Sequence, residues 1–374
     1  MRKTIKNVML LDGKKIKIVI EDDKIQAIGT DVEEVGEIIM LPDGVYVSPG
    51  WIDLHTHAFP KFEPYCAYPD DIGFLSGVTT VVDAGSCGAY DIDEFYTLIK
   101  TCITRVFSFL NISTVGLRIR NELADLGHIS RSEIKHALEK YPDFIVGLKA
   151  RMSKSVVGDN GIKPLQLAKS YSRDFKKPVM VHIGSVPPKL EEILACLDQG
   201  DIITHCYHNK KNNHIFSDET LIENALKHAK ERGVYLDVGH GTSSFSFQIA
   251  QRAFEEKIDF DSISTDIYDK NRLQGPVYNM ATTLTKFLTI GYSLEKVISA
   301  VTDVPAEAIG KQELASFSEG TIADFTFFKL EKNKQILVDS VGGKIHANEK
   351  ITPVAVMIGG VYYECSEHEV EASY

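Results

Sequence analysis

Two hydrophobic patterns alternate along the middle of the chain. Continuous apolar runs, such as PVMVHIG at residues 178–184, are followed by amphipathic stretches, such as SRSEIKHALEKY at residues 130–141. Buried parallel strands form continuous apolar runs, whereas a helix that covers a sheet has apolar positions every three or four residues. The pattern therefore predicts a parallel sheet with covering helices.

Eight strand-like runs occur, and helical stretches that include residues 187–200 and 218–233 separate most of them. The runs are residues 45–55, 78–85, 106–114, 144–150, 178–184, 202–208, 234–241 and 262–268. Eight such units favour a (β/α)8 TIM barrel, of class α/β, over an open doubly wound sheet. The first interval also lacks GxGxxG after its strand, which weakens a dinucleotide-binding interpretation.

Short strand-like runs dominate both ends of the chain. Asp12-Gly13 marks a hairpin near the start, and Gly359-Gly360 separates two strand-like runs near the end. We therefore expect a small β-sandwich domain built from residues 1–47 and 312–374, and a barrel from residues 48–311.

Composition and charge narrow the partners. The chain has 374 residues, with 44% hydrophobic and 25% charged residues and a formal net charge of -11. These fractions are ordinary for a globular protein, and the negative charge argues against nucleic-acid or anionic-membrane binding. We expect a small-molecule substrate, no nucleic acid and no membrane partner, and we leave homo-oligomerisation open.

The cysteines and the N-terminus indicate a cytoplasmic protein. The six cysteines form no CxxC pair, as expected for reduced thiols. The first residues alternate charged and apolar side chains without the continuous apolar segment of a signal peptide. No run approaches the ~20 apolar residues of a membrane span.

The first strand ends in SPGWIDLHTHAF, residues 48–59, which places Asp53, His55 and His57 on one side of a strand. Adjacent histidines can share a cation, although a single histidine is more often a surface residue or a satisfied core residue. Later strands end in further polar residues: Lys149, His182, His205 and Asp266. All would lie at the carboxyl mouth of the barrel, and histidine and carboxylate are favoured zinc ligands. The sequence therefore predicts a metal site.

Lys149 is the unusual member, because an ammonium group would repel a metal ion. Addition of CO2 to its neutral amine would give a carbamate, an anion able to bridge two metals. A lysine paired with a nearby carboxylate is the alternative, and the surrounding histidines favour the carbamate.

Other polar residues are weaker candidates. His136, His228 and His346 fall in polar patterns that predict solvent exposure, and His208 and His214 lie in an expected surface loop. His240 could contact substrate or have a structural role.

The motifs PGWIDLHTH, GLKARMS, MVHIG, ITHCYH, STDI, VTDVPAEAIG and EGTIADFTFF resemble those of the amidohydrolase superfamily of metal-dependent hydrolases. The resemblance spans nearly the whole chain and implies a (β/α)8 barrel with a β-sandwich from both termini. By position, it implies that one divalent ion binds His55, His57 and Asp266. The other binds His182 and His205, and carboxylated Lys149 lies between them. Zn²⁺ is the expected ion.

Within that superfamily, the chain is similar to dihydroorotase-like proteins of the amidohydrolase/deacetylase family. This similarity implies removal of an acetyl group from an N-acetyl amino acid or an acetylated 2-hydroxy acid, with Asp266 as the proton shuttle. Cyclic-amide hydrolysis, adenine-type deamination and a catalytically inactive structural relative are the alternatives.

Substrate recognition is expected to differ from that of dihydroorotases, which usually carry an Arg shortly after HxH. Here Ala58 and Phe59 follow, and Phe59 is expected to add apolar area at the mouth. Arg151 could bind a substrate carboxylate or form a surface salt bridge, and Tyr268 and Tyr278 are further candidates for substrate binding.

Overall fold

We analysed a computed structural model of the chain, which describes residues 1–218 and 220–366. Residue 219, in the predicted helix 218–233, lies outside the described residues. So do residues 367–374 of the predicted terminal domain.

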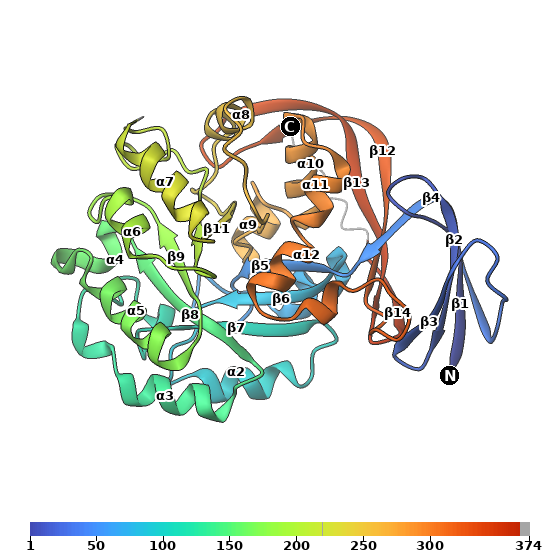
Figure 1. Cartoon of the computed structure of the whole chain (residues 1–374), viewed down its shortest axis with the longest axis horizontal. Helices are drawn as coiled ribbons and strands as arrows, with labels where there is room; N and C mark the ends of the chain where they lie inside the picture. Colours follow the sequence, from blue (N-terminus) through green and yellow to red (C-terminus); the bar gives the residue numbers. More distant parts are fainter. Residues whose placement is uncertain (219, 367–374) are drawn as a thin grey trace.

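A curled parallel sheet of seven strands forms the centre of the molecule, in the order β11-β10-β9-β8-β7-β6-β5 (Figure 1). The strands are β5 (Trp51–Thr56), β6 (Val78–Ala84), β7 (Arg105–Asn111), β8 (Ile145–Met152), β9 (Val179–Ile183), β10 (Ile202–Thr204) and β11 (Tyr235–Asp237). All six neighbouring pairs are parallel. The apolar runs of the sequence therefore did form the predicted parallel sheet.

Residues 262–268, the predicted eighth strand, close the barrel without forming a regular strand. Isolated parallel bridges join Ser262 to Asp237 of β11 and Ile267 to Thr56 of β5. Between them Asp266 has a φ of 50°, which an extended strand cannot accommodate. The segment thus completes the TIM barrel while its backbone departs from strand geometry at Asp266.

Helices cover the outside of the barrel and carry buried apolar residues (Figure 1). They are α1 (Pro69–Ile72), α2 (Ile92–Ile99), α3 (Arg131–Lys140), α4 (Lys154–Val157), α5 (Lys163–Phe175), α6 (Leu190–Cys196), α7 (Leu221–Glu231), α8 (Phe247–Glu255), α9 (Asp269–Gln274), α10 (Met280–Ile290), α11 (Leu294–Ser299) and α12 (Asp303–Ala308). In the described part of the chain, no helix has the length and apolar character needed to cross a membrane.

Strands from both ends of the chain form a second sheet of seven strands, ordered β14-β13-β12-β4-β1-β2-β3. They are β1 (Arg2–Met9), β2 (Lys15–Glu21), β3 (Lys24–Gly29), β4 (Glu37–Pro49), β12 (Phe325–Val338), β13 (Lys344–Ile358) and β14 (Val361–Glu364). Its neighbouring pairs are antiparallel except β1 and β4. The predicted fold class, a TIM barrel with a β domain built from both termini, is confirmed.

The predicted first strand, residues 45–55, is divided between the two sheets. β4 ends at Pro49 in the terminal sheet, and β5 begins at Trp51 in the barrel. A Cβ at Gly50 would overlap the side chain of Thr79, so only glycine allows the chain to cross here. The apolar pattern continues through this point because both strands are buried.

β12 and β13 extend beyond the terminal sheet as a long hairpin that crosses the barrel near α10 (Figure 1). Ile351 of β13 donates its N–H to Thr285 Oγ1 of α10 over 3.1 Å. At the hairpin tip, Asp339 accepts the N–H of Phe247 at the start of α8 over 2.8 Å. The hairpin therefore holds two helices of the barrel.

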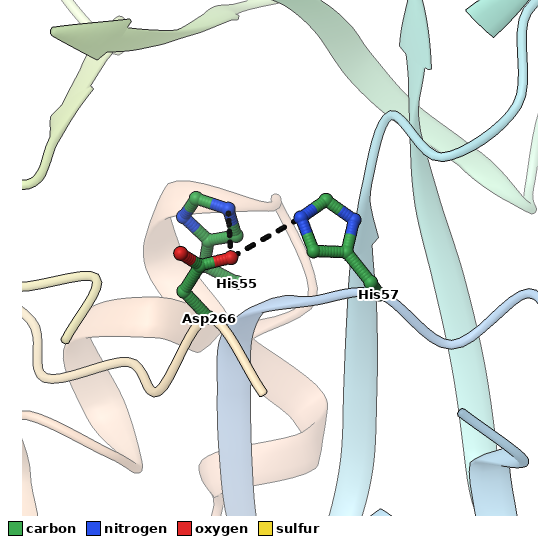
Figure 2. Close-up of side chains that lie close together, drawn as sticks. All are labelled: His55, His57 and Asp266. Carbon is green, nitrogen blue, oxygen red and sulfur yellow. Dashed lines mark ion pairs between the residues drawn. The ribbon is translucent and has the colours of Figure 1, made fainter. Parts of the chain in front are cut away.

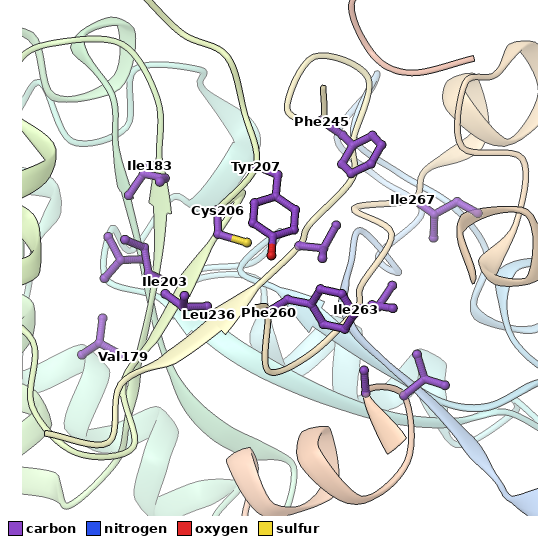
Figure 3. Close-up of a cluster of buried hydrophobic side chains, with 14 of the residues drawn as sticks. Val179, Ile183, Ile203, Cys206, Tyr207, Leu236, Phe245, Phe260, Ile263 and Ile267 are labelled. Carbon is purple, nitrogen blue, oxygen red and sulfur yellow. The ribbon is translucent and has the colours of Figure 1, made fainter. Parts of the chain in front are cut away.

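A large apolar cluster fills the space between strands and helices (Figure 3). Leu236 of β11 and Phe260, which precedes the barrel-closing segment, belong to it together with Tyr207 and Phe245. Burying such side chains contributes about 1.5–3 kcal/mol each for the aliphatic and Phe members. This packing fixes the strand ends on which the candidate site is built.

Candidate functional site

Three predicted ligands meet at the carboxyl mouth of the barrel. Asp266 Oδ1 lies 3.4 Å from His55 Nε2 and 3.1 Å from His57 Nε2, and Figure 2 shows it between the two rings. Their ligand atoms all fall within 4.8 Å of one another. His55 and His57 are almost fully buried, whereas the Asp266 side chain keeps 15% of its exposure. The group could hold a cation that a small molecule can still reach.

His182 of β9 and His205, just after β10, form a second pair beside the first. His182 Nδ1 and His205 Nε2 face each other at 2.7 Å. The ring centre of His205 is 5.0 Å from that of His55. The four predicted histidines therefore form one continuous cluster.

Lys149 of β8 completes the cluster. Its Nζ lies 3.5 Å from His55 Nε2, and the residue is 1% exposed. A Cβ at Gly85 would come within 2.6 Å of Lys149 Cβ, so glycine opposite makes room for this side chain. Burial lowers the pKa of Lys149 to about 7, while Asp266 opposes that shift. A substantial fraction of the amine is then uncharged near neutral pH, the form that reacts with CO2.

A hydrogen-bonded chain orients His55. Its Nδ1 lies 2.8 Å from Thr204 Oγ1, and the Thr204 hydroxyl donates to Asp237 Oδ2 over 2.6 Å. Because that hydroxyl proton is used by Asp237, Thr204 accepts from Nδ1–H of His55. The lone pair of His55 is then on Nε2, which faces Asp266.

His57 and His205 are oriented in the same way. Nδ1 of His57 lies 2.9 Å from Ser86 Oγ, and Nδ1 of His205 donates to the carbonyl of Gly239 over 2.6 Å. A ring that donates from Nδ1 presents its Nε2 lone pair as a ligand. Burial lowers the pKa of His205 to about 4, so its ring is neutral, as metal binding requires.

Three buried carboxylates surround the histidines: Asp53, Asp83 and Asp237. The hydroxyls of Thr204, Ser262 and Ser264 donate to Asp237. Backbone N–H groups donate to Asp53 and Asp83, and the Thr265 hydroxyl also donates to Asp53. These donors are neutral, and burial raises the pKa of all three acids, to about 7 for Asp53. Divalent cations at the cluster would supply the missing positive charge, so the residues present fit a metal centre.

Two members of the cluster have left-handed backbones. His205 has a φ of 73° and Asp266 a φ of 50°. Non-glycine residues rarely adopt this region, and such outliers concentrate at functional sites. The packed strand ends hold both side chains in orientations that regular strands would not provide.

An aromatic wall borders His57. The rings of Tyr65 and Tyr268 lie 5.6 Å and 6.3 Å from the His57 ring, and 5.2 Å from each other. The Tyr268 hydroxyl is bound to Thr242 Oγ1 at 2.6 Å. Tyr268 is one of the predicted candidates for substrate binding, whereas Tyr65 lies in a loop with no chemical signal in the sequence.

Arg151 lies next to Tyr65 of this wall. Its Nη1 is 3.2 Å and 3.1 Å from the two carboxylate oxygens of Glu122, which is fully buried. Its guanidinium also faces the Tyr65 ring, 5.9 Å from the ring centre. Glu122 is buried and Arg151 is partly buried, so the pair is not a surface salt bridge, and it places a cation near the aromatic wall.

His240 and Tyr278 are the two other predicted substrate contacts. His240 is fully buried, and both ring nitrogens have partners inside the protein, Lys286 Nζ and the Gly241 carbonyl. This arrangement favours a structural role over a substrate contact. Tyr278 packs beside Gly275, and its contact with substrate stays a prediction.

Two expectations about buried and exposed residues were wrong. Phe59 is 1% exposed and packs 5.0 Å from Phe95, because the chain turns inward after His57, so it adds no area at the mouth. His208 is fully buried rather than in a surface loop, and its Nε2 has no partner among the described residues. The histidines expected to be solvated are exposed: His136, His228 and His346.

Comparisons with known proteins identify deacetylase relatives of this chain. Residues 317–364 match the family described as a deacetylase-like composite domain. A curated deacetylase from Enterococcus faecalis is 44% identical over 362 residues, covering 96% of this chain and 98% of the relative. A deacetylase from Brucella anthropi is 35% identical over 344 residues, covering 91% of this chain and 85% of the relative.

Solved structures share the whole fold. One described as an adenine deaminase has a TM-score of 0.93 and 44% identity, covering 97% of this chain and 99% of the other. One described as a dihydroorotase has a TM-score of 0.91 and 32% identity, covering 98% of each chain. The chain therefore belongs to the amidohydrolase superfamily, among its deacetylase relatives, and is a metal-dependent hydrolase.

Proposed function

We propose that the protein removes an acetyl group from a small carboxylated molecule, an N-acetyl amino acid or an acetylated 2-hydroxy acid. The observation that carries the proposal is the His55–His57–Asp266 group in a chain whose curated relatives are deacetylases. Arg151 supports an acidic substrate, because its guanidinium lies near the aromatic wall beside His57. The guanidinium N–H groups of Arg151 that do not bind Glu122 could bind a substrate carboxylate.

We further propose two divalent ions, with Zn²⁺ as the expected one. His55, His57 and Asp266 would hold the first, and His182 and His205 the second. Carboxylated Lys149 would lie between the two groups. The contact of Lys149 Nζ with His55 Nε2 and the facing nitrogens of His182 and His205 support this assignment.

When bound, the cations supply Lewis acidity, which lowers the pKa of water and polarises the scissile carbonyl. Residues of the chain transfer the proton and bind the substrate. Asp266 accepts a proton at its partly exposed carboxylate and passes it to the leaving nitrogen or oxygen. The aromatic wall of Tyr65 and Tyr268 bounds the substrate and excludes water from one side.

Two alternatives have a specific observation behind them. Similar solved structures are described as an adenine deaminase and a dihydroorotase. Either reaction would use the same residues, but the attacked carbon would belong to a ring rather than to an acetyl group. No arginine follows HxH closely in this chain, which weakens the dihydroorotase alternative.

One substrate screen separates these reactions. Zinc-loaded protein is assayed with N-acetyl amino acids of both hands, acetylated 2-hydroxy acids, dihydroorotate and adenine. We expect acetate release from at least one acid, with negligible turnover of dihydroorotate and adenine. Efficient turnover of either ring substrate without acetate release would refute the proposal.

Metal analysis tests the lysine bridge. Protein produced with ample zinc and bicarbonate should approach two ions per chain, and Lys149→Ala should lose at least one of them. Lys169→Ala is the matched control, since Lys169 is also buried but pairs with Asp201 before β10. A Lys149 variant that kept two ions and full activity would exclude the carbamate.

A further inference from the structure

A buried lysine next to the candidate site has no part in the chemistry described above. Lys286 of α10 is fully buried and donates from Nζ to His240 Nε2 over 2.8 Å and to the Pro276 carbonyl over 2.7 Å. Because His240 Nε2 accepts, the ring proton is on Nδ1, which donates to the Gly241 carbonyl over 2.9 Å. Lys286 thus acts on the backbone of Gly241 through the His240 ring.

The β12–β13 hairpin holds the same carbonyl from another direction. Ser340 Oγ donates to the Gly241 carbonyl over 2.7 Å, and the Ser340 N–H donates to the Phe245 carbonyl over 3.1 Å. The Phe245 ring stacks on His240 with ring centres 4.5 Å apart. The backbone at Gly241 is therefore fixed by a helix of the barrel and by the terminal hairpin together.

Gly241 lies directly against the proposed catalytic carboxylate. It has a φ of 56°, and a Cβ added there would overlap Asp266 Oδ2. Its N–H donates to the Thr265 carbonyl, next to Asp266, over 2.9 Å. The Gly241 backbone thus packs directly against the Asp266 carboxylate and limits where that carboxylate can lie.

We infer that Lys286 and Ser340 are positioning residues, which hold the His240–Gly241 backbone so that it sets the orientation of the Asp266 carboxylate. The inference rests on the proposed role of Asp266. It assigns a function to a buried lysine and a hairpin tip that touch neither metal ligand nor substrate. Misplacing a reacting group by about 1 Å can cost about 100-fold in rate.

The first test compares variants by kcat and KM on the N-acetyl amino acid that is turned over fastest. Lys286→Met and Ser340→Ala should lower kcat by about 10- to 100-fold and leave KM within about threefold, because substrate binding is not altered. His240→Leu should behave like Lys286→Met. His240→Gln, whose side-chain oxygen reaches the place of Nε2 and keeps the contact with Lys286 but not the Nδ1–H donor, should recover part of the lost rate. Equal activity of the Leu and Gln variants would overturn the inference.

Coupling to Asp266 distinguishes positioning from general destabilisation. In the Asp266→Asn background, Lys286→Met should lower kcat no further, because the group that it positions is already lost. Lys169→Met is the control: it removes a buried lysine at the other end of the barrel and should lower only the melting temperature. Additive losses from Lys286→Met and Asp266→Asn would contradict positioning.

A spectroscopic readout does not depend on turnover. Visible absorption of the cobalt-loaded protein reports the geometry of its ligands. Lys286→Met should shift that spectrum in the same direction as Asp266→Asn, and Lys169→Met should not. If Asp266→Asn keeps wild-type kcat, the proposed role of Asp266 as proton shuttle fails, and the positioning inference fails with it. If it loses activity while the Lys286 and Ser340 variants match the wild type in rate and spectrum, only the positioning role fails.

Discussion

At the scale of single residues, the side chain of Asp266 combines two properties that rarely occur together. It lies within 3.4 Å of both His55 Nε2 and His57 Nε2, and yet 15% of it remains exposed. A ligand that was fully buried could not exchange protons with substrate. Partial exposure lets one carboxylate both bind a cation and move a proton.

Asp266→Asn should therefore keep the fold and much of the metal while kcat falls by at least about 100-fold. The amide retains an oxygen ligand but cannot accept the proton. Steady-state kinetics with metal analysis of the same samples check this. Asp269→Asn is the control, at a half-exposed neighbouring acid that pairs with Arg272 rather than with the histidines. Near-normal kcat in the Asp266 variant would remove this residue from the mechanism.

The Arg151–Glu122 pair governs a second prediction at this scale. Arg151→Met should raise KM for the acetylated acid about tenfold or more, with a smaller effect on an uncharged analogue such as the corresponding amide. The KM for the acid should rise more than the KM for the amide only if Arg151 binds the substrate carboxylate.

The variant leaves Glu122 buried and unpaired, which is itself destabilising. Arg151→Met combined with Glu122→Gln removes both charges and is the matched control for folding. The deciding measurement is the KM for the acid divided by the KM for the amide, compared between the double variant and the wild type. A double variant that treats acid and amide as the wild type does would remove Arg151 from substrate recognition.

At the scale of elements, the tip of the β12–β13 hairpin is a cap for the barrel. Asp339 accepts N–H groups from Phe247, Val341 and Gly343 over 2.8, 2.9 and 2.7 Å. One buried carboxylate thus closes the hairpin and begins α8, which places the loop after β11.

Asp339→Ala should lower the free energy of unfolding by about 2–3 kcal/mol, since the buried N–H of Phe247 and two part-buried N–H groups lose a charged acceptor. Denaturant titration measures the loss. Glu349→Ala, an exposed acid on the same hairpin, should change stability by less than about 0.5 kcal/mol. Similar losses in the two variants would show that the tip does not act as a cap.

The local pattern of apolar residues predicted which segments are strands or helices. Tertiary contacts decided where each strand ends. The run at residues 78–85 became β6 (Val78–Ala84), because a buried parallel strand is apolar on both faces. The run at residues 45–55 instead contains two strands, since hydrophobicity cannot show that the chain changes sheets at Gly50. The eighth run lost strand geometry where Asp266 turns toward the histidines.

At the scale of the whole molecule, the charge around the cluster matters most. Asp53, Asp83 and Asp237 are buried with neutral donors, and Asp266 adds a fourth carboxylate. Buried anions are costly without a counter-charge. Bound cations should therefore stabilise the entire fold as well as the site.

Removal of metal by a chelator should lower the melting temperature, and added zinc should restore it. A ligand present at about 1,000 times its dissociation constant stabilises the native state by about 4 kcal/mol. Calorimetry with and without chelator measures this. The His55→Ala, His57→Ala double variant should respond much less. A chelator-treated protein with unchanged melting temperature and confirmed metal loss would refute the link.

The sequence alone determined the fold class and the membership of the candidate site. Apolar runs and amphipathic stretches specify strands and covering helices locally, and polar residues at strand ends must meet at one mouth once the barrel closes. His55, His57, His182, His205, Lys149 and Asp266 were all predicted on that basis, and the structure brings them together.

Only the tertiary structure decided what surrounds them. Tyr65 reaches the site from a loop, and Phe59 turns into the core, although both follow HxH within ten residues. His240 is occupied by Lys286, which is 46 residues away in the chain. Side-chain direction in loops and contacts between distant segments depend on how the whole chain packs. No local pattern of residues encodes them.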